Sequence, residues 1–154
     1  EVDLTRREFD SGPLETELAR HGITIARMAP ADRTELDAYL AATWGATWRI
    51  EGLAALDFDP PSGFIARQRQ DGRDAIVGFA VNDVARPGWF GPIGTDEALR
   101  GLGVGTALLL RCMRAWQEAG RTRGEINWIG PLRFYVRAVD ATICRVIWQM
   151  GKEW

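Results

Sequence analysis

The segment Arg100-Gly101-Leu102-Gly103-Val104-Gly105 places three glycines directly before a stretch with the periodicity of a helix. The first turn of a helix has unpaired backbone N–H groups and a positive dipole, which capping side chains and acidic residues normally satisfy. No acidic residue lies between Arg100 and Leu110, and only Thr106 offers a local cap. We therefore expect a turn whose accessible N–H groups, together with Arg100, bind an anion such as a pyrophosphate.

The glycines also suit other motifs. They can simply permit a tight turn that binds nothing. A dinucleotide-binding Gly-x-Gly-x-x-Gly motif should follow a strand directly, but Asp96–Leu99 intervene and Leu108 occupies the third glycine position. The lysine of a Walker A motif is absent from the segment. An anion-binding turn and a plain tight turn are therefore the two interpretations left open.

Alternating and helical periodicities predict the elements that must position this turn. In chain order they are a strand over 23–28, a helix from Pro30, a second helix over 44–56, strands over 64–68, 75–82 and 89–95, a helix over 104–120, a strand over 125–129, a helix from Pro131 and a strand over 143–150. Asp71-Gly72 predicts a tight hairpin turn between the second and third strands. Gly91, Pro92 and Gly94 weaken pairing in the fourth strand, which is therefore expected to be bulged or incompletely paired.

Length and composition predict one α/β domain, because 154 residues with 46% hydrophobic side chains suffice for one core. Residues 1–20 are charged, weakly periodic and interrupted by Ser11-Gly12-Pro13. They are expected to form an N-terminal arm or linker before a domain over 21–154. His21, the only histidine, lies at the end of this arm and is expected to be solvated rather than catalytic.

Charge and hydropathy argue against several functions. With 19 basic and 21 acidic residues, the chain lacks the positive charge that nucleic-acid binding requires. The longest apolar run, 107–110, is far shorter than the ~20 residues of a membrane span, so no membrane partner and a cytoplasmic location are expected. Cys112 and Cys144 lack metal-ligand spacing and have apolar neighbours, so buried free thiols are expected and no metal site.

The Arg-x-x-Gly-x-Gly sequence between the fourth predicted strand and the long helix resembles the GNAT family of acyl-CoA N-acetyltransferases. The resemblance spans about residues 23–154, and its most specific parts are Gly91–Leu110, Phe134-Tyr135 and Val139–Ala141. It implies a single α/β domain whose mixed, mostly antiparallel sheet splays between the fourth and fifth strands and is flanked by about four helices. It also implies acetyl-CoA as the cofactor.

By motif position, the resemblance assigns the contacts to acetyl-CoA. Ile93 and Thr95 would offer backbone groups to the pantetheine arm, and Tyr135 would place its phenol beside the sulfur. The residues assigned to the pyrophosphate and its surroundings are Arg100, Leu102, Gly103, Val104, Gly105 and Thr106.

The implied reaction is direct attack of an amine on the acetyl thioester. It requires a deprotonated amine, a polarised carbonyl and a proton for the departing thiolate. Tyr135 is the candidate general acid, although its place on an apolar helix face also suits simple packing. The candidate bases are Glu125, Asn127 and Asp83, or a chain of ordered water.

Two residues depart from the family pattern. Trp128 stands where many members have asparagine, and Asp140 stands where many have glycine. Residues 128–135 and the linker-like first twenty residues resemble the C-terminal module of proteins with two GNAT repeats. A catalytically silent CoA-binding or scaffold module is therefore the alternative to an active enzyme.

The acceptor is expected to lie against the first two predicted helices, where Trp44, Trp48 and Arg49 cluster. The tryptophans also suit ordinary core packing. The acceptor would be a small-molecule or peptide amine, and a homodimer or an upstream second GNAT module is left open as a protein partner.

Overall fold

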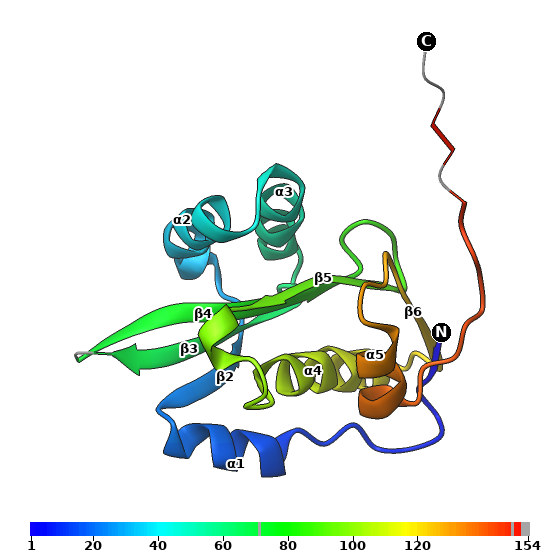
Figure 1. Ribbon diagram of the computed structural model, residues 1–154, viewed down its shortest axis with the longest axis horizontal. Coiled ribbons are helices and arrows are strands. Elements are labelled where there is room, and N and C mark those ends of the chain that lie inside the picture. The colour runs from blue at the N-terminus through cyan, green and yellow to red at the C-terminus, as the bar shows by residue number, and fades with distance from the viewer. Residues whose placement is uncertain (71, 149, 152–154) are drawn as a thin grey trace.

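The computed structural model describes residues 1–70, 72–148, 150 and 151. In this part of the chain, helices cover both faces of one sheet (Figure 1). The strands are β1 (Val2–Asp3), β2 (Ile23–Arg27), β3 (Gly63–Gln70), β4 (Arg73–Asn82), β5 (Trp89–Thr95) and β6 (Arg123–Ile126). The helices are α1 (Gly12–Arg20), α2 (Arg33–Thr43), α3 (Ala46–Ala54), α4 (Val104–Glu118) and α5 (Leu132–Val139).

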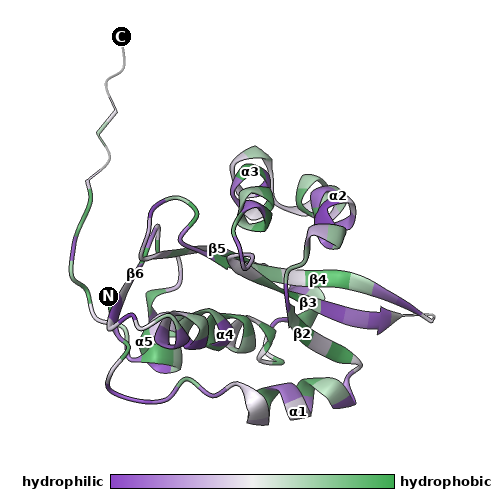
Figure 2. Cartoon of the chain, turned by 180° about the vertical axis from the view of Figure 1, so that it is seen from behind, coloured by the Kyte–Doolittle hydropathy of each residue, from purple (hydrophilic) through white to green (hydrophobic). Residues whose placement is uncertain are grey.

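The sheet is mixed and mostly antiparallel, with the strand order β1-β6-β5-β4-β3-β2. Every neighbouring pair is antiparallel except β5 and β6, which run parallel. In β4, the residues from Ile76 to Asn82 are all buried, because helices cover both faces of the sheet there. Figure 2 shows the outer ends of β3 and β4 in purple, where the two strands extend beyond the helices as a hydrophilic hairpin.

Two hydrophobic clusters hold the helices against the sheet. On one face, Leu36 and Leu40 of α2 pack with Phe79 of β4, and α3 completes this layer. On the other face, α4 contributes the fully buried Leu108 and Met113, and α1 and α5 lie beside α4 (Figure 1). Across the described part of the chain, no helix combines the length and hydropathy of a transmembrane span.

Most predicted elements are confirmed, as is the α/β class with a mixed sheet flanked by helices. The antiparallel pair β3–β4 forms as expected; Gly72 of its turn has φ +80°, and Asp71 lies outside the described residues. β5 is bulged as expected, since its register with β4 shifts between Ala80 and Asn82. β6 begins two residues earlier than predicted, and Trp128, with φ +48°, cannot continue it.

Residues 1–20, expected to be an arm or linker, pack onto the domain instead. β1 pairs antiparallel with β6, and residues 12–20 form α1. The side chains of Val2, Phe9 and Leu18 are at most 1% exposed. The Ser11-Gly12-Pro13 interruption is the start of α1, because proline in a first helical turn costs no hydrogen bond.

The predicted strand over 143–150 is wrong for the residues described there. Residues 143–148 have no strand partner among the described residues, and this segment leaves the domain in Figure 1. Ile143, Trp148 and Met150 are 65%, 83% and 92% exposed. β-branched residues favour a strand only where a neighbouring strand is available. Cys144 is exposed for the same reason, so the predicted burial holds for Cys112 alone.

Candidate active site

β5 and β6 run parallel but pair only at the first two residues of β5. β6 then ends, whereas β5 continues to Thr95. Asp96 donates its backbone N–H to the carbonyl of Val77 in β4. Because backbone groups alternate along a strand, those of Thr95 and Ile93 face away from β4, toward the opening. The two residues predicted to meet the pantetheine arm therefore lie on a strand edge that β6 does not cover.

A cavity of about 1140 Å³ opens where the two strands diverge. Its walls come from β5, the turn before α4, α3, α5 and the loops beside them. Eight of the nine predicted site residues line it, namely Ile93, Thr95, Arg100, Gly103, Val104, Gly105, Thr106 and Tyr135. Leu102 is not among the lining residues, and it donates its N–H to the carbonyl of Leu99 at 3.3 Å.

The turn before α4 presents backbone N–H groups to this cavity. Gly101 and Gly103 have φ values of +89° and +94°, which favour glycine. No side chain of the described residues caps α4, and its first turn contains no acid. Among the described residues, no acceptor is found for the N–H groups of residues 103–106. These donors and the positive end of the helix dipole fit an anion such as a diphosphate.

Arg100 adds positive charge at the same turn. Its guanidinium lies 3.0 Å from the carboxylate of Glu97, and both side chains are largely exposed. An exposed ion pair of this kind contributes little to stability. Arg100 can therefore exchange Glu97 for a phosphate at small cost.

Tyr135 lies on α5 with its ring packed against Phe90 and Phe134, at centroid distances of 6.3 and 4.9 Å. It lines the cavity, and its hydroxyl has no hydrogen-bond partner among the described residues. Burial raises the pKa of Tyr135 to about 12, so the phenol is protonated at neutral pH. The ring of Tyr135 is thus part of the core, and its phenolic hydroxyl is a proton donor at the cavity.

The candidate bases differ in their surroundings. Asp83 pairs with Arg121 at 2.9 Å and also accepts an indole N–H, so its carboxylate is already engaged within the protein. Glu125 pairs with Arg145 at 3.2 Å and does not line the cavity. Asn127 does line it, but an amide is not a base at neutral pH. None of the three brings a free carboxylate into the cavity.

An aromatic wall from the α2–α3 layer bounds the cavity. Trp44 and Trp48 stack with ring centroids 4.9 Å apart, and both contact Phe79 edge-on. They therefore contribute to the core and also present aromatic surface to the cavity. Arg49, predicted with them, does not line the cavity, because its guanidinium pairs with Asp37 at 2.5 Å.

The two departures from the family pattern both adopt left-handed backbone conformations. Asp140 has φ +52° after α5, and aspartate is one of the few residue types besides glycine that tolerates this region. Trp128, with φ +48°, lines the cavity and is 74% exposed. His21 is solvated as expected, and it does not line the cavity.

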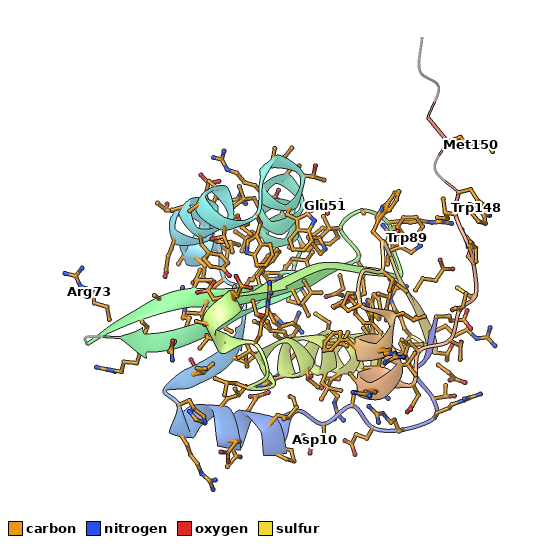
Figure 3. All side chains as sticks on the ribbon, viewed as in Figure 1. Asp10, Glu51, Arg73, Trp89, Trp148 and Met150 are labelled. Atoms are coloured by element: carbon orange, nitrogen blue, oxygen red, sulfur yellow. The ribbon has the colours of Figure 1, made fainter. Side chains whose placement is uncertain are left out.

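Glu51 of α3 is a cavity residue that sequence analysis did not identify. It lines the cavity, and its carboxylate has neither a hydrogen bond nor an ion pair among the described residues. In Figure 3 it lies on the side of α3 that faces the loop between β4 and β5. Its spacing could have identified it, because Glu51 follows Trp48 by three positions and residues at that spacing share one face of a helix.

The chain matches no curated protein sequence. Several solved structures share its fold. A GCN5-related glucosamine N-acetyltransferase region of a fungal multi-domain GH3 β-N-acetylglucosaminidase superposes with a TM-score of 0.69 at 17% identity. That match covers 90% of this chain, which spans only 18% of the fungal protein's length. At this identity the likeness shows the fold alone.

Two smaller enzymes show the same likeness. The aminoglycoside N-acetyltransferase AAC(6')-Iy, in complex with CoA, has a TM-score of 0.61 at 18% identity, covering 84% of this chain and 95% of its own. A ribosomal-protein-alanine N-acetyltransferase from Brucella melitensis biovar Abortus 2308 has a TM-score of 0.57 at 19% identity, covering 86% and 100%. The family profile of the GNAT acetyltransferases matches residues 31–131, which is more than half of the sequence. The chain therefore belongs to the acetyltransferase (GNAT) family.

Proposed function

We propose that this chain moves an acetyl group from acetyl-CoA to a primary amine by direct attack. The observation that carries the proposal is the cavity between the diverging strands β5 and β6. It joins an open strand edge, a turn with available N–H groups and the phenol of Tyr135. Membership in the GNAT family supports it. The cytoplasmic location expected from the sequence belongs to the same proposal.

The cavity walls would hold the coenzyme through its polar groups. The open backbone edge at Ile93 and Thr95 offers strand-like hydrogen bonds to the amide-containing arm. The N–H groups of residues 103–106, with the guanidinium of Arg100, would bind the diphosphate. The N–H of Leu102 would not take part, because it is already donated to the carbonyl of Leu99.

The chemistry requires two proton transfers. Acetyl-CoA supplies an acetyl group activated as a thioester; the amine nitrogen bonds to the acetyl carbon, and the carbon–sulfur bond breaks. The amine loses a proton and the sulfur gains one. Because Asp83 and Glu125 are engaged elsewhere, the amine proton would leave through water.

Tyr135 would stabilise the departing sulfur. Its pKa of about 12 keeps the phenol protonated and available as a donor. An ordinary thiol has a pKa of about 8.5, so a thiolate is a weaker base than this phenolate. The phenol would therefore act mainly by hydrogen-bonding to the charge that develops on sulfur, where its contribution is greatest in the transition state. The thiolate would then take its proton from the water that accepted the proton of the amine.

Titration calorimetry with acetyl-CoA and with desulfo-CoA tests the coenzyme site before the acceptor is known. We expect both compounds to bind, because the diphosphate and the pantetheine arm are common to them. A chain that binds neither compound refutes the proposal.

Tyr135→Phe tests the role of the phenol, with an amine identified from a broad panel. We expect kcat to fall about 100-fold. The free energy of unfolding should change by less than about 1 kcal/mol, because the hydroxyl has no partner in the described part of the chain. An unchanged kcat and pH profile would assign Tyr135 to packing alone.

A catalytically silent CoA-binding or scaffold module is the second candidate. The engagement of Asp83 and Glu125 by arginines favours it, as do the exposed apolar side chains of residues 143–148. Such a surface suits a protein partner, either a second copy in a homodimer or an upstream second GNAT module. Thermal stabilisation by acetyl-CoA without acetyl transfer to any amine would select this candidate, and sedimentation would show whether the chain self-associates.

A further inference from the structure

We propose that Glu51 is the residue that recognises the acceptor, and that the acceptor enters the cavity as an ammonium ion held between this carboxylate and the tryptophans around it. The inference rests on the proposed function, because it assigns a substrate class to the same cavity. It concerns the acceptor side alone and makes no use of the turn before α4.

The first observation is that the carboxylate of Glu51 lacks a partner within the described part of the chain, where other acids have one. Its carboxylate has no ion pair or hydrogen bond among the described residues, although its backbone carbonyl accepts the N–H of Ala55. By contrast, Asp37 in the same helical layer pairs with Arg49, and both Asp32 and Glu35 pair with Arg67. A partly buried carboxylate without a protein partner is expensive to maintain. A ligand cation would supply the missing partner.

The second observation is the charge distribution around the cavity. Among the described residues that line it, Glu51 is the only acid and Arg100 the only base. Arg100 belongs to the turn that suits a diphosphate, whereas Glu51 belongs to α3 and lies beside the aromatic wall. The negative charges of a coenzyme bound at the turn before α4 would leave Glu51 in a negative potential, which attracts cations and repels acids. Burial already raises the pKa of Glu51, and a bound ammonium would lower it again.

The third observation is the aromatic surface beside this carboxylate. Trp44, Trp48, Trp89 and Trp128 all line the cavity. Indole faces attract ammonium and guanidinium groups. The structure already contains such a contact, since the guanidinium of Arg86 lies 5.4 Å from the ring of Trp89. A carboxylate combined with indoles recognises a cation attached to an apolar or flat body.

These features define the acceptor as an amine that is protonated in solution, with a pKa near the ~10.4 of a lysine side chain. Aromatic amines that are neutral at pH 7 would gain nothing from Glu51. The role of Glu51 is to bind and position the cation, and the proton is lost only after the nitrogen has been placed.

A matched pair of probes tests the inference directly. Cyclohexylmethylamine and cyclohexylmethanol have nearly the same shape, and only the amine carries a positive charge at pH 7. Ligand-observed NMR titrations would measure their dissociation constants with the full chain, both with and without desulfo-CoA. We expect the amine to bind at least about 10-fold more tightly than the alcohol, the ratio that one favourable charge-assisted contact of about 1.4 kcal/mol provides.

Glu51→Gln preserves the size of the side chain and removes its charge. We expect this variant to lose the preference for the amine, while its affinity for the alcohol and for desulfo-CoA stays within about twofold of wild type. Glu17→Gln is the matched control, because Glu17 is an exposed acid of α1, which packs on the other face of the sheet. It should behave as wild type.

Equal binding of the two probes, a preference that survives Glu51→Gln, or no binding of the amine would each overturn the inference. Failure of the proposed function is distinguishable, because it appears as absent binding of acetyl-CoA and desulfo-CoA in the wild-type chain. The amine titration without coenzyme is independent of that result.

Discussion

Replacing Thr106 with glutamate would place an acid at the third residue of α4, in a turn that contains no acid and that no side chain of the described residues caps. The structure predicts opposite effects on stability and on coenzyme binding. An acid in the first turn interacts favourably with the helix dipole and the free N–H groups, by about 0.3–1 kcal/mol. For a chain of this length, that corresponds to a rise in Tm of about 1–3 °C.

The same carboxylate would oppose the coenzyme. At about 5 Å from a diphosphate with two charges, Coulomb's law in water gives ~0.8 kcal/mol per charge, or ~1.7 kcal/mol in total. This corresponds to about a 15-fold loss of affinity, and more where water is excluded. The side chain would also compete for the N–H groups of the turn.

Calorimetric titration with acetyl-CoA at low ionic strength, paired with thermal melts, measures both effects. Thr106→Gln is the control, because it has the size of glutamate without the charge. It should bind acetyl-CoA within about threefold of wild type and gain little stability. If Thr106→Glu binds acetyl-CoA as tightly as Thr106→Gln does, the turn does not hold the diphosphate, and the reasoning fails.

Two further predictions concern stability. A Cβ at Gly94 would lie 2.6 Å from the ring of Trp44, so Gly94→Ala should lower the free energy of unfolding by about 1–3 kcal/mol in urea denaturation. In the control Gly105→Ala, where the nearest atoms are 3.8 Å away, no such loss should occur. Burial opposes ionisation of Glu15, but its hydrogen bonds with Arg111 prevail and lower its pKa below the usual 4.5. The resulting stabilisation is fully present above pH 4.5 and is lost as the pH falls through the lowered pKa. The free energy of unfolding, measured from pH 6 to pH 3, should therefore fall more steeply for wild type than for Arg111→Met.

The elements that sequence analysis predicted correctly are those that local residues determine. The spacing of Leu108, Cys112 and Trp116 predicts an amphipathic helix for α4, and all three are buried there. The absence of an acid between Arg100 and Leu110 predicted an uncapped helix start, and no side chain in the described part of the chain caps it. Tyr135 could be placed beside the same cavity only through the family resemblance, because nothing local relates it to the turn.

The features that were missed depend on residues far away in the chain. α1 has few apolar residues of its own, and it is held to α4 by Leu18 in the common core and by the Glu15–Arg111 pair. The run over 143–150 has the composition of a strand, but composition cannot show whether a sheet edge is free. Asp37 has an arginine opposite it, whereas Glu51 has none within residues 1–70, 72–148, 150 and 151, and that difference exists only after the chain has folded.

The four indoles around the cavity make the protein its own optical probe. The fluorescence emission of tryptophan shifts with the polarity and hydration of its ring. Any compound that displaces water from the cavity should therefore change the emission of Trp44, Trp48, Trp89 and Trp128 together. Trp116 of α4 is 1% exposed in the core on the opposite face of the sheet, so its emission should not respond. Occupancy could therefore be followed in unlabelled protein before any product has been identified.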